Sequence, residues 1–445
     1  MNKCLVALMA ATFVSGSAFA DTTTPSPAAK DLSKAVDKVN YVESDVSGIK
    51  LSGYVDAGYI YNFISAAPGL SGNTPNTIGT RFGQDGKSGG DFNLNTVKLT
   101  VSKDLTDKNE WQAGFRADVM LGEDAGGGLG GNGSGPNTNN GSDSFLLEQG
   151  YVTFRAPVGN GIDFKVGKFV TWLGYEVIER PSNLNITYGN LFQNMIPLYH
   201  TGVSAEYKIN ENFNTGLAIV NGYNSDSNTG FDSNNDGYGM EAKIGYTNKG
   251  GNFSVQNAVY YSWDSAGQVI PSIDANKSSN GNVVINDIVA NWTPKFANGK
   301  LLLGANGDFG YAQLATNDAG YGSFITGKGS NEETWFGLAL YAKYQFTDLF
   351  SLAARADYMH DNYGQKLFGS WPATNSDPNG TLDNTDIWSL TLTAGFNLAE
   401  NLTLRAEYRV DFGDDIQGSY DSSGYYYGNG QNTAQTVAVE AVYTF

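Results

Sequence analysis

The chain has 445 residues, a formal net charge of −18 and one cysteine. A nucleic-acid-binding protein needs clustered Lys and Arg to neutralise phosphates, so this acidic balance argues against that class. The single cysteine, Cys4, excludes a disulfide scaffold and a thiolate metal site, and 56 Gly with 26 Tyr and 24 Phe favour an all-β chain.

Residues 1–20 have the pattern of a secretory signal peptide. Lys3 provides the positive end, an apolar run extends from Leu5 to Val14, and Ala18-Phe19-Ala20 is a small-x-small cleavage site. The apolar run is too short to cross a bilayer as a helix. We therefore expect an exported Gram-negative protein. Its mature chain lacks Cys4. Because the positive charge of Lys3 is also removed, the formal net charge changes from −18 to −19.

Residues 21–50 differ in composition from the rest of the chain. Thr22–Pro27 is a Pro/Thr/Ser linker, and apolar residues then recur at helical spacing within Ala28–Tyr41. This pattern predicts a periplasmic N-terminal segment, either as a short amphipathic helix or as a disordered tether.

From residue 51 to residue 445, apolar and polar residues alternate with a period of two, which predicts strands. We expect sixteen strands, each long enough to cross a bilayer when tilted. They are Leu51–Phe63, Phe92–Asp104, Glu110–Leu121, Phe145–Pro157, Gly161–Leu173, Pro197–Ile209, Phe213–Tyr223, Gly237–Asn248, Asn252–Asp264, Val283–Lys295, Lys300–Ala312, Glu333–Phe346, Phe350–Asp361, Asp386–Leu398, Asn401–Gly413 and Asn432–Phe445.

The connections between these strands alternate strictly between short and long. Seven are short, such as Val158–Asn160, and eight have 13 to 28 residues, mostly Gly, Asn, Ser and Asp; Ile64–Asp91 and Asp414–Gln431 are examples. A soluble sandwich has no reason to sort its loops in this way. The pattern predicts a transmembrane antiparallel up-and-down β-barrel with short periplasmic turns and long extracellular loops.

Charged residues alternate in phase with apolar ones. In Asn401–Gly413, Leu402, Leu404, Ala406, Tyr408, Val410 and Phe412 share one face, opposite Arg405, Glu407, Arg409 and Asp411. The same phasing places Arg116 and Asp118, and Arg355 and Asp357, opposite apolar faces. An Arg or Lys facing mid-bilayer lipid costs about 2–4 kcal/mol, so we expect these eight charges to face water in the lumen.

The phasing places ten basic and ten acidic residues in the lumen, which predicts little built-in ion preference. The basic set is Lys98, Arg116, Arg155, Lys165, Lys208, Lys243, Lys343, Arg355, Arg405 and Arg409. The acidic set is Asp56, Asp118, Glu206, Glu241, Asp287, Asp308, Asp357, Glu407, Asp411 and Glu440. Two polar residues, Asn257 and Lys168, fall on the lipid side; a bulge near Gly167 could re-aim Lys168.

Two runs resemble a known family. They are LEQGYVTFRAPVGNGIDFKVGKFVTWLGYE (Leu147–Glu176) and NMIPLYHTGVSAEY (Asn194–Tyr207). The hairpin with its VGKF run, the Gly-Tyr-Glu after it and the Pro-x-x-His-Thr-Gly strand start are similar to the OmpL-like outer-membrane β-barrel porins. The match covers about 60 residues, and the barrel pattern extends it to the end. The resemblance implies a pore and leaves the solute open.

Other motifs carry little chemistry. Gly126-x-Gly128-x-x-Gly131 lies in a Gly/Asn loop with no helix after it, and Asp232–Gly237 begins like a calcium loop that has Lys243 instead of Glu at position twelve. His200 and His360 lie on strands that we place far apart, with no nucleophile motif nearby. We therefore expect no cofactor, no metal and no enzymatic activity.

We rank three functions. The first is an outer-membrane porin through which small hydrophilic solutes and ions diffuse passively, because a 16-stranded barrel leaves an aqueous channel. The second is a channel selective for a sugar or small anion, which needs an aromatic track or a one-sided charge ladder. The third is a surface adhesin or receptor. The sequence leaves open whether the chain is a monomer or a homotrimer.

The third long connection, Gly174–Ile196, differs from the others because it is apolar. Its nine large apolar residues are Val177, Ile178, Leu184, Ile186, Tyr188, Leu191, Phe192, Met195 and Ile196. Such a loop should bury them, and we expect it to fold into the barrel, although it could instead cap the mouth or cover another subunit. Glu176, Glu179 and Arg180 are then candidate constriction charges, facing lumen residues such as Arg405 and Arg409.

The final strand ends the chain on an aromatic residue, Phe445. This end is the kind that barrel-assembly machinery could recognise, and it could also anchor the chain in the aromatic girdle of the membrane interface. We expect lipid and lipopolysaccharide as the surroundings of the outer face.

Overall fold

The computed structural model describes residues 48–63, 76–77, 89–126, 145–223, 238–263, 282–313, 332–362, 385–420 and 426–445. The signal peptide, the N-terminal segment up to residue 47, the calcium-like turn at 232–237 and most residues of the long loops lie outside these ranges.

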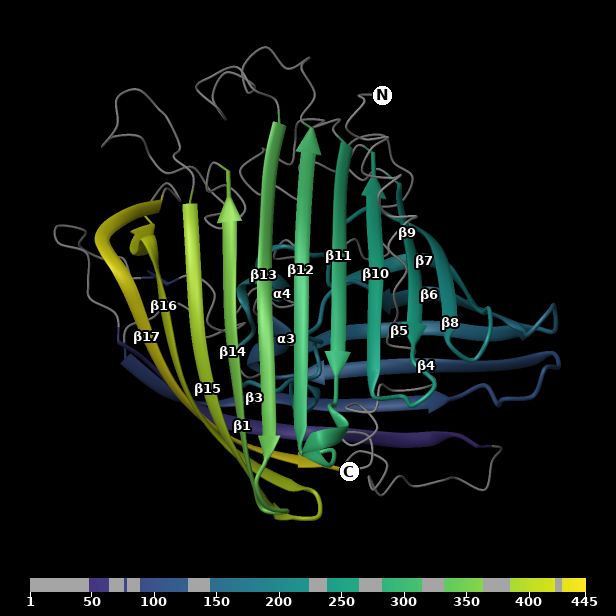
Figure 1. Cartoon of the computed structure of the whole chain (residues 1–445), viewed down its shortest axis with the longest axis horizontal. Helices are drawn as coiled ribbons and strands as arrows, with labels where there is room; N and C mark the ends of the chain where they lie inside the picture. Colours follow the sequence, from purple (N-terminus) through teal and green to yellow (C-terminus); the bar gives the residue numbers. More distant parts are fainter. Residues whose placement is uncertain are drawn as a thin grey trace.

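Within the described ranges, sixteen long strands form one antiparallel barrel (Figure 1). Each long strand pairs with the one before and the one after it, and β17 pairs with β1 to close the ring. The long strands are β1 (Lys50–Phe63), β3 (Gly89–Lys103), β4 (Gln112–Leu121), β5 (Phe145–Ala156), β6 (Ile162–Val170), β7 (Tyr199–Lys208), β8 (Phe213–Val220), β9 (Gly239–Thr247), β10 (Phe253–Ser262), β11 (Asn282–Trp292), β12 (Leu301–Gln313), β13 (Glu332–Gln345), β14 (Phe350–Asp361), β15 (Thr385–Ala399), β16 (Leu402–Tyr420) and β17 (Tyr426–Thr444). The predicted fold and its sixteen strands are confirmed.

Short elements complete the described structure. They are β2 (Asn76–Thr77), which pairs with β16, the helices α3 (Glu123–Gly126) and α4 (Asn190–Asn194), and the 3-10 turns η2 (Arg180–Ser182) and η3 (Lys295–Ala297). No helix in the described ranges has both the length and the apolar character to cross a membrane.

One predicted loop is wrong. The stretch expected as the long loop Asp414–Gln431 is largely a continuation of β16 and β17, which are joined by residues 421–425. The pairing continues with irregular register, from Gln417 opposite Gln431 to Tyr420 opposite Tyr426. The backbone N–H and C=O groups of the β16 extension pair with β17 on one side and with β2 on the other. This pairing lets the strands continue through a stretch rich in Gly and Asp.

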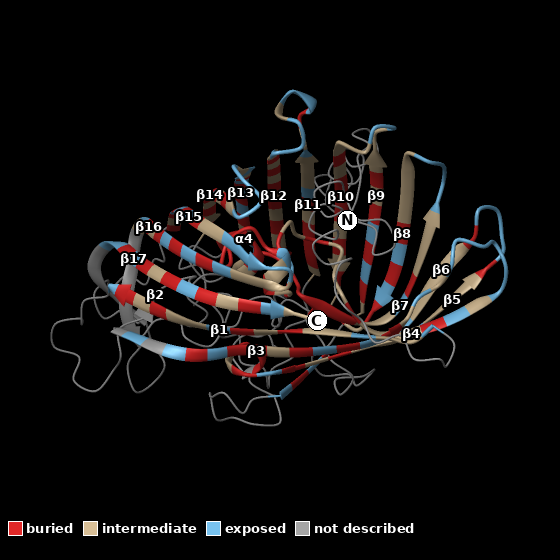
Figure 2. Cartoon of the chain, turned by 90° about the horizontal axis from the view of Figure 1, so that it is seen from below, coloured by how far each residue is buried: buried red, intermediate tan, exposed pale blue. Residues whose placement is uncertain are grey.

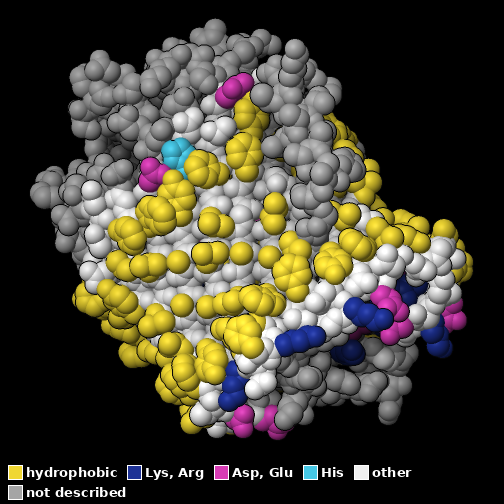
Figure 3. All heavy atoms as spheres, in the orientation of Figure 1, with side chains coloured by type: hydrophobic (Ala, Val, Ile, Leu, Met, Phe, Trp, Pro, Cys, Tyr) yellow, Lys and Arg dark blue, Asp and Glu magenta, His cyan; other side chains and the backbone are white. Residues whose placement is uncertain are grey.

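The alternation of faces follows the sequence closely (Figure 2). On β14, Arg355 and Asp357 are buried, whereas the alternating residues Ala354 and Ala356 are exposed. The outer face carries rows of apolar side chains over the strands (Figure 3). Leu340, Leu390 and Val439 are each at least 50% exposed on it, as a surface that contacts lipid requires.

The two polar residues on the lipid side have backbone partners. Asn257 Nδ2 donates to the carbonyl of Asp287 on β11 at 2.8 Å, which satisfies its amide. Lys168 Nζ donates to the Leu147 carbonyl at 2.9 Å and lies 4.0 Å from the centre of the Tyr199 ring. The bulge suggested near Gly167 is absent, because β6 pairs with β5 and β7 without a register shift.

Two bulges lie on neighbouring strands instead. In β3 the extra residue is Asn95, opposite the step from Asp56 to Ala57, and in β5 it is Glu148, opposite the step from Asp118 to Val119. Since an extra residue reverses the facing of the positions beyond it, both Asn95 and Glu148 point inward. Both are fully buried.

The chain end takes part in closing the barrel. Phe445 N donates to the Gly53 carbonyl and Gly53 N donates to the Phe445 carbonyl, both at 2.9 Å. The Phe445 ring covers Gly53, where an added Cβ would come within 2.8 Å of the ring. The last residue therefore contributes two hydrogen bonds and an aromatic contact to the seam between β17 and β1.

We expect deletion of Phe445 to lower the amount of folded barrel in the outer membrane. The deletion removes both seam hydrogen bonds, which contribute about 0.5–1.5 kcal/mol each, together with the terminal aromatic ring. Heat-modifiable, protease-resistant protein measures the folded fraction. Phe445→Ala, which keeps the backbone bonds, separates the ring from the backbone, and wild-type yield for the deletion would contradict the expectation.

Candidate functional site

The connection between β6 and β7, Thr171–Leu198, runs inside the barrel; we call it the inward segment. It contains η2 and α4, and eight of its nine large apolar residues are buried, while Val177 is 39% exposed. Seven of the eight pack in one cluster with interior side chains of β10–β14, among them Tyr260, Trp335 and Met359, and Ile186 packs with Ile60 and Ala438. The segment therefore fills part of the lumen with a hydrophobic core.

Charged side chains of β14 and β16 hold the backbone of the inward segment. Arg355 Nη1 donates to the Thr187 carbonyl at 2.6 Å, and Arg409 Nη1 donates to the Tyr188 carbonyl at 2.6 Å. The Glu407 carboxylate accepts from Ile186 N at 2.5 Å and from Thr187 N at 3.0 Å. Irregular backbone inside a barrel has no ladder of its own, so it needs such partners.

This arrangement corrects part of the sequence prediction. Arg355, Asp357, Arg405, Glu407, Arg409 and Asp411 do point inward, but none is more than 8% exposed. They face the inward segment rather than open water, because its carbonyl and amide groups occupy them. Of the eight predicted lumen charges, only the Arg116 side chain, 32% exposed, is partly open, and its partner Asp118 is buried.

The structure pairs Glu176 and Glu179 with predicted lumen residues, although not with Arg405 or Arg409, and it pairs Arg180 with a residue outside the predicted lumen set. Glu176 pairs with Arg355 at 2.7 Å, and Arg180 pairs with Asp124 at 2.5 Å. Glu179 pairs with Lys98 at 2.7 Å. Neither predicted partner, Arg405 or Arg409, forms these ion pairs.

Arg405 and Arg409 contact the segment in another way. Arg405 donates to the carbonyls of Arg180 and Asn183, at 3.1 and 2.7 Å, and its own ion pair is with Glu440. The alternation in the sequence predicts only on which side of the strand a side chain lies. It does not predict whether an inward-facing arginine binds a carboxylate or a backbone carbonyl.

The electrostatic environments of the two glutamates on the segment are opposite. Burial raises the pKa of Glu176, and the Arg355 charge and the Gly189 amide offset this only in part. Burial also acts to raise the pKa of Glu179, but the nearby charges of Lys98 and Arg116 outweigh burial and lower it. Glu179 therefore retains its negative charge more readily than Glu176 does.

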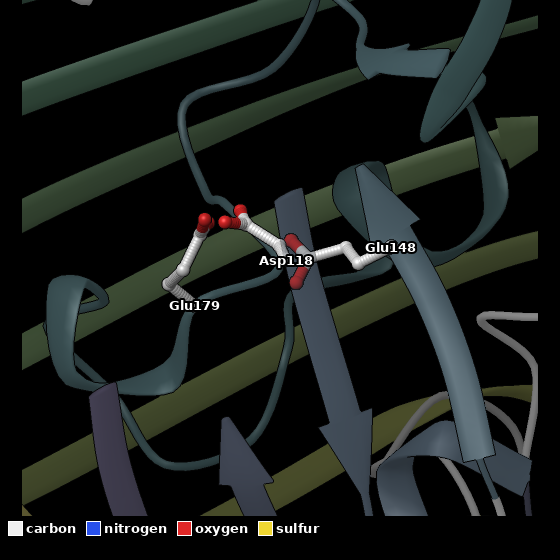
Figure 4. Close-up of side chains that lie close together, drawn as sticks. All are labelled: Asp118, Glu148 and Glu179. Atoms are coloured by element: carbon white, nitrogen blue, oxygen red, sulfur yellow. The ribbon is translucent and has the colours of Figure 1, made fainter. Parts of the chain in front are cut away.

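Three carboxyl groups converge on Lys98: Asp118 from β4, Glu148 from β5 and Glu179 from the inward segment (Figure 4). Their oxygens lie within 4.8 Å of one another, a spacing that could hold a cation. The Lys98 ammonium lies 2.7 Å from Glu148 and Glu179 and 3.2 Å from Asp118. Because this ammonium already supplies the positive charge among the three, the donor set does not fit a resident divalent metal.

Glu148 is a site residue that the sequence analysis missed. Strict alternation through β5 puts its neighbours Leu147 and Gln149 on the inner face with Arg155, whereas the bulge puts Glu148 and Gln149 inside and leaves Leu147 45% exposed outside. Gly150, two residues further on, is a local signal of irregularity in this strand, but it does not identify the extra residue.

The partly exposed charged side chains lie on the interior face of β4–β7, which we call the open wall. Arg155 pairs with Asp163 at 2.6 Å, and Lys165 pairs with Glu206 at 2.9 Å. Together with Arg116 and Glu179 they are 14 to 32% exposed, in contrast to the buried charges of β14 and β16. Two aromatic residues, Tyr151 and Trp172, lie beside Lys165 and Lys243.

The chain resembles known outer-membrane proteins. The family model described as "Putative beta-barrel porin-2, OmpL-like" matches residues 48–445. The outer membrane channel DcaP of Acinetobacter baumannii superimposes with a TM-score of 0.55 at 13% identity, covering 91% of this chain and 99% of DcaP. No curated protein matches the sequence.

Two further solved structures share the fold. An anion-selective porin from Comamonas acidovorans has a TM-score of 0.54 and 13% identity, with 89% of this chain and 99% of that chain covered. OmpT of Vibrio cholerae has a TM-score of 0.52 and 11% identity, with 91% of this chain and all of that chain covered. At these identities the likeness shows the fold.

We expect Glu407→Ala to loosen the inward segment. The substitution leaves the buried donors Ile186 N, Thr187 N and Thr187 Oγ1 without their acceptor, at a cost of about 1–3 kcal/mol for each unsatisfied group. Denaturant unfolding and hydrogen exchange at residues 183–190 measure the effect. Asp348→Ala, at an exposed turn, is the control; equal stability and equal exchange in the two variants would show that Glu407 does not hold the segment.

Proposed function

We propose a solute path and a constriction for this chain, which belongs to the OmpL-like β-barrel porin family. The protein is an outer-membrane porin that forms a channel. The path runs along the open wall, where partly exposed charges line the interior, and small hydrophilic solutes and ions diffuse through it passively. The position of the inward segment against β14 and β16 supports this assignment, because it fills the opposite side of the lumen.

The constriction lies between the inward segment and the open wall. Of the three candidate charges on the segment, Glu179 is 24% exposed and lies 3.7 Å from Arg116 across the gap. Glu176 and Arg180 are buried, at 4% and 0% exposure. We therefore assign Glu179 and Arg116 to the constriction itself, and we assign Glu176 and Arg180 to positioning the segment.

A second function has one observation in its favour. Tyr151 and Trp172 are half-buried aromatic side chains beside the charged pairs of the open wall. Aromatic faces next to charged pairs would also suit a channel selective for a sugar. Block of the ion current by an added sugar, lost in Trp172→Ala, would favour the selective channel over the general porin. We assign no enzymatic activity and no cofactor to either.

We also propose how the chain is divided into segments and what its outer face and its last residue contact. Residues 1–20 are a cleaved signal peptide, residues 21–50 a periplasmic segment and residues 51–445 the barrel. The apolar outer face contacts lipid and, at the extracellular side, lipopolysaccharide. Phe445 is the residue that the barrel-assembly machinery reads, supported by its place at the seam.

A homotrimer is the proposed assembly. A structure of V. cholerae OmpT with a TM-score of 0.51 is described as a trimer form. On this chain, a hollow in the outer face over β16, β17, β1 and β3 is lined in part by small residues, Ala57, Ala406 and Ala441. Bulky apolar side chains of a second copy could fill that hollow, and crosslinking in native membranes distinguishes a trimer from a monomer.

Replacement of Asn183–Asn194 by a short Gly/Ser bridge should raise single-channel conductance and the size limit for uncharged solutes. The change removes α4 and the buried apolar residues that fill the lumen. Planar-bilayer recording and liposome swelling measure the two effects. Unchanged conductance in a variant that still forms a heat-modifiable barrel would contradict the constriction.

The channel should show near-neutral ion selectivity with at most a mild cation preference. Along the open wall Arg116, Arg155 and Lys165 each pair with an acidic group, so the charges of these pairs cancel. The excess acid of the chain concentrates cations at the mouth. The reversal potential across a salt gradient tests this, and strong anion selectivity would contradict the charge balance.

A further inference from the structure

Asp287 and Asp308 form a buried pair of carboxyl groups that no basic side chain neutralises. They are direct cross-strand partners on β11 and β12, with 0% and 4% exposure. Neither forms an ion pair with a Lys or Arg of the described ranges, in contrast to the inward-facing acids Asp118 and Glu206. Nothing in the passive pore requires such a pair.

The two carboxyl groups differ in their other partners. Asp287 accepts from Asn306 Nδ2 at 2.5 Å. Asp308 accepts no hydrogen bond from a donor of the described residues through either oxygen, and it stands directly opposite Asp287 on the neighbouring strand, where facing Cβ atoms are about 4.5–5.5 Å apart. Two buried carboxylates at that separation repel, so they remain together when one proton lies between them, as in other carboxyl dyads.

The surroundings offer no alternative positive charge. Glu241 on β9 is a third buried acid, and His200 Nε2 lies 3.9 Å from it. Tyr223, after β8, is a neutral phenol because burial raises its pKa. Ala258 of β10 and Gly337 of β13 are the cross-strand neighbours of the pair. Lys243, the basic group that acts on Glu241, is itself bonded to Glu206 at 2.6 Å.

The pair lies under the start of the inward segment, residues 171–175, which we call the arm. Asn306, bonded to Asp287, accepts from Tyr175 N at 3.2 Å, and Glu241 accepts from Trp172 N at 2.8 Å. The Tyr175 ring lies over Gly304, two residues before Asn306, and stacks on Tyr341 at 4.0 Å between centroids. The arm is therefore fastened to the wall of β9–β13 through the acids.

We propose that Asp287 and Asp308 share one proton and form a pH-operated latch that fastens the arm to the barrel wall. The pair and its proton carry one negative charge, which Asn306 and the arm stabilise. At alkaline pH the shared proton leaves to water, and a second charge is then buried without a partner. Burying an unpaired charge is costly, so water must enter the site and the arm loosens. This inference rests on the proposed constriction, because the arm positions the segment that forms it.

The test is single-channel conductance of the full-length protein from mildly acidic to alkaline pH. Wild type should show a rise in conductance at the alkaline end, with faster hydrogen exchange at residues 171–175. Asp308→Asn should lose this rise, because a carboxamide donates to Asp287 at every pH. Asp287→Asn should lose it as well, since a single carboxyl group has no partner to share a proton with. Asp348→Asn, at an exposed turn, is the control and should keep the rise.

Three outcomes would overturn the latch. The first is an unchanged alkaline rise in both folded Asn variants. The second is a wild type with no alkaline rise at all. The third is a rise produced at neutral pH by a chelator, which would show a divalent cation between the carboxyl groups. The Asn183–Asn194 replacement separates the two proposals: if it raises conductance while the Asn variants keep the alkaline rise, the constriction stands and the latch fails.

Discussion

The structure depends on the closure of one hydrogen-bonded ladder, between β17 and β1. In hydrocarbon each unpaired backbone N–H or C=O costs several kcal/mol, so an open edge within the bilayer is not tolerated. Ten residue pairs from Tyr54–Thr444 to Phe63–Gln435 close the ring, and Phe445 adds two bonds at Gly53. The in-phase alternation on every strand follows from this closure, because a closed ring has an inside and an outside.

The same requirement explains why the interior of β14 and β16 is so strongly charged. The inward segment is irregular, and its carbonyl and amide groups have no ladder to join. Arg355, Glu407 and Arg409 supply fixed donors and acceptors for residues 186–188. Buried ion pairs such as Glu176–Arg355 contribute little net stability once desolvation is counted. Their physical contribution is to specify the position in which the backbone of residues 186–188 is hydrogen-bonded.

The sequence predicts the strands and their facing well because lipid and water impose a period of two over more than a dozen segments. On β14 and β16 the predicted inner and outer residues are those found. The facing fails at Glu148, because a bulge reverses the phase of β5 and the nearby Gly150 does not by itself identify the extra residue. The apolar composition of Gly174–Ile196 was enough to suggest that it folds inward. Its partners could not be derived, since they lie up to 225 residues away and several bind backbone carbonyl groups of the segment rather than its charged side chains.

The inward segment covers the charges of β14 and β16, whereas the charges of the open wall are partly exposed. This difference changes how the charges of the lumen should be interpreted. A count over all inward-facing residues treats Arg409, which is fully buried, and Arg116, which is 32% exposed, as equal. Only partly exposed groups act on a passing ion at full strength, and those of the open wall are held in close pairs. A close pair has a field that falls off quickly, so the passage carries local dipoles rather than a net potential. Solute choice should therefore depend on the width set by the inward segment more than on the net charge of the chain.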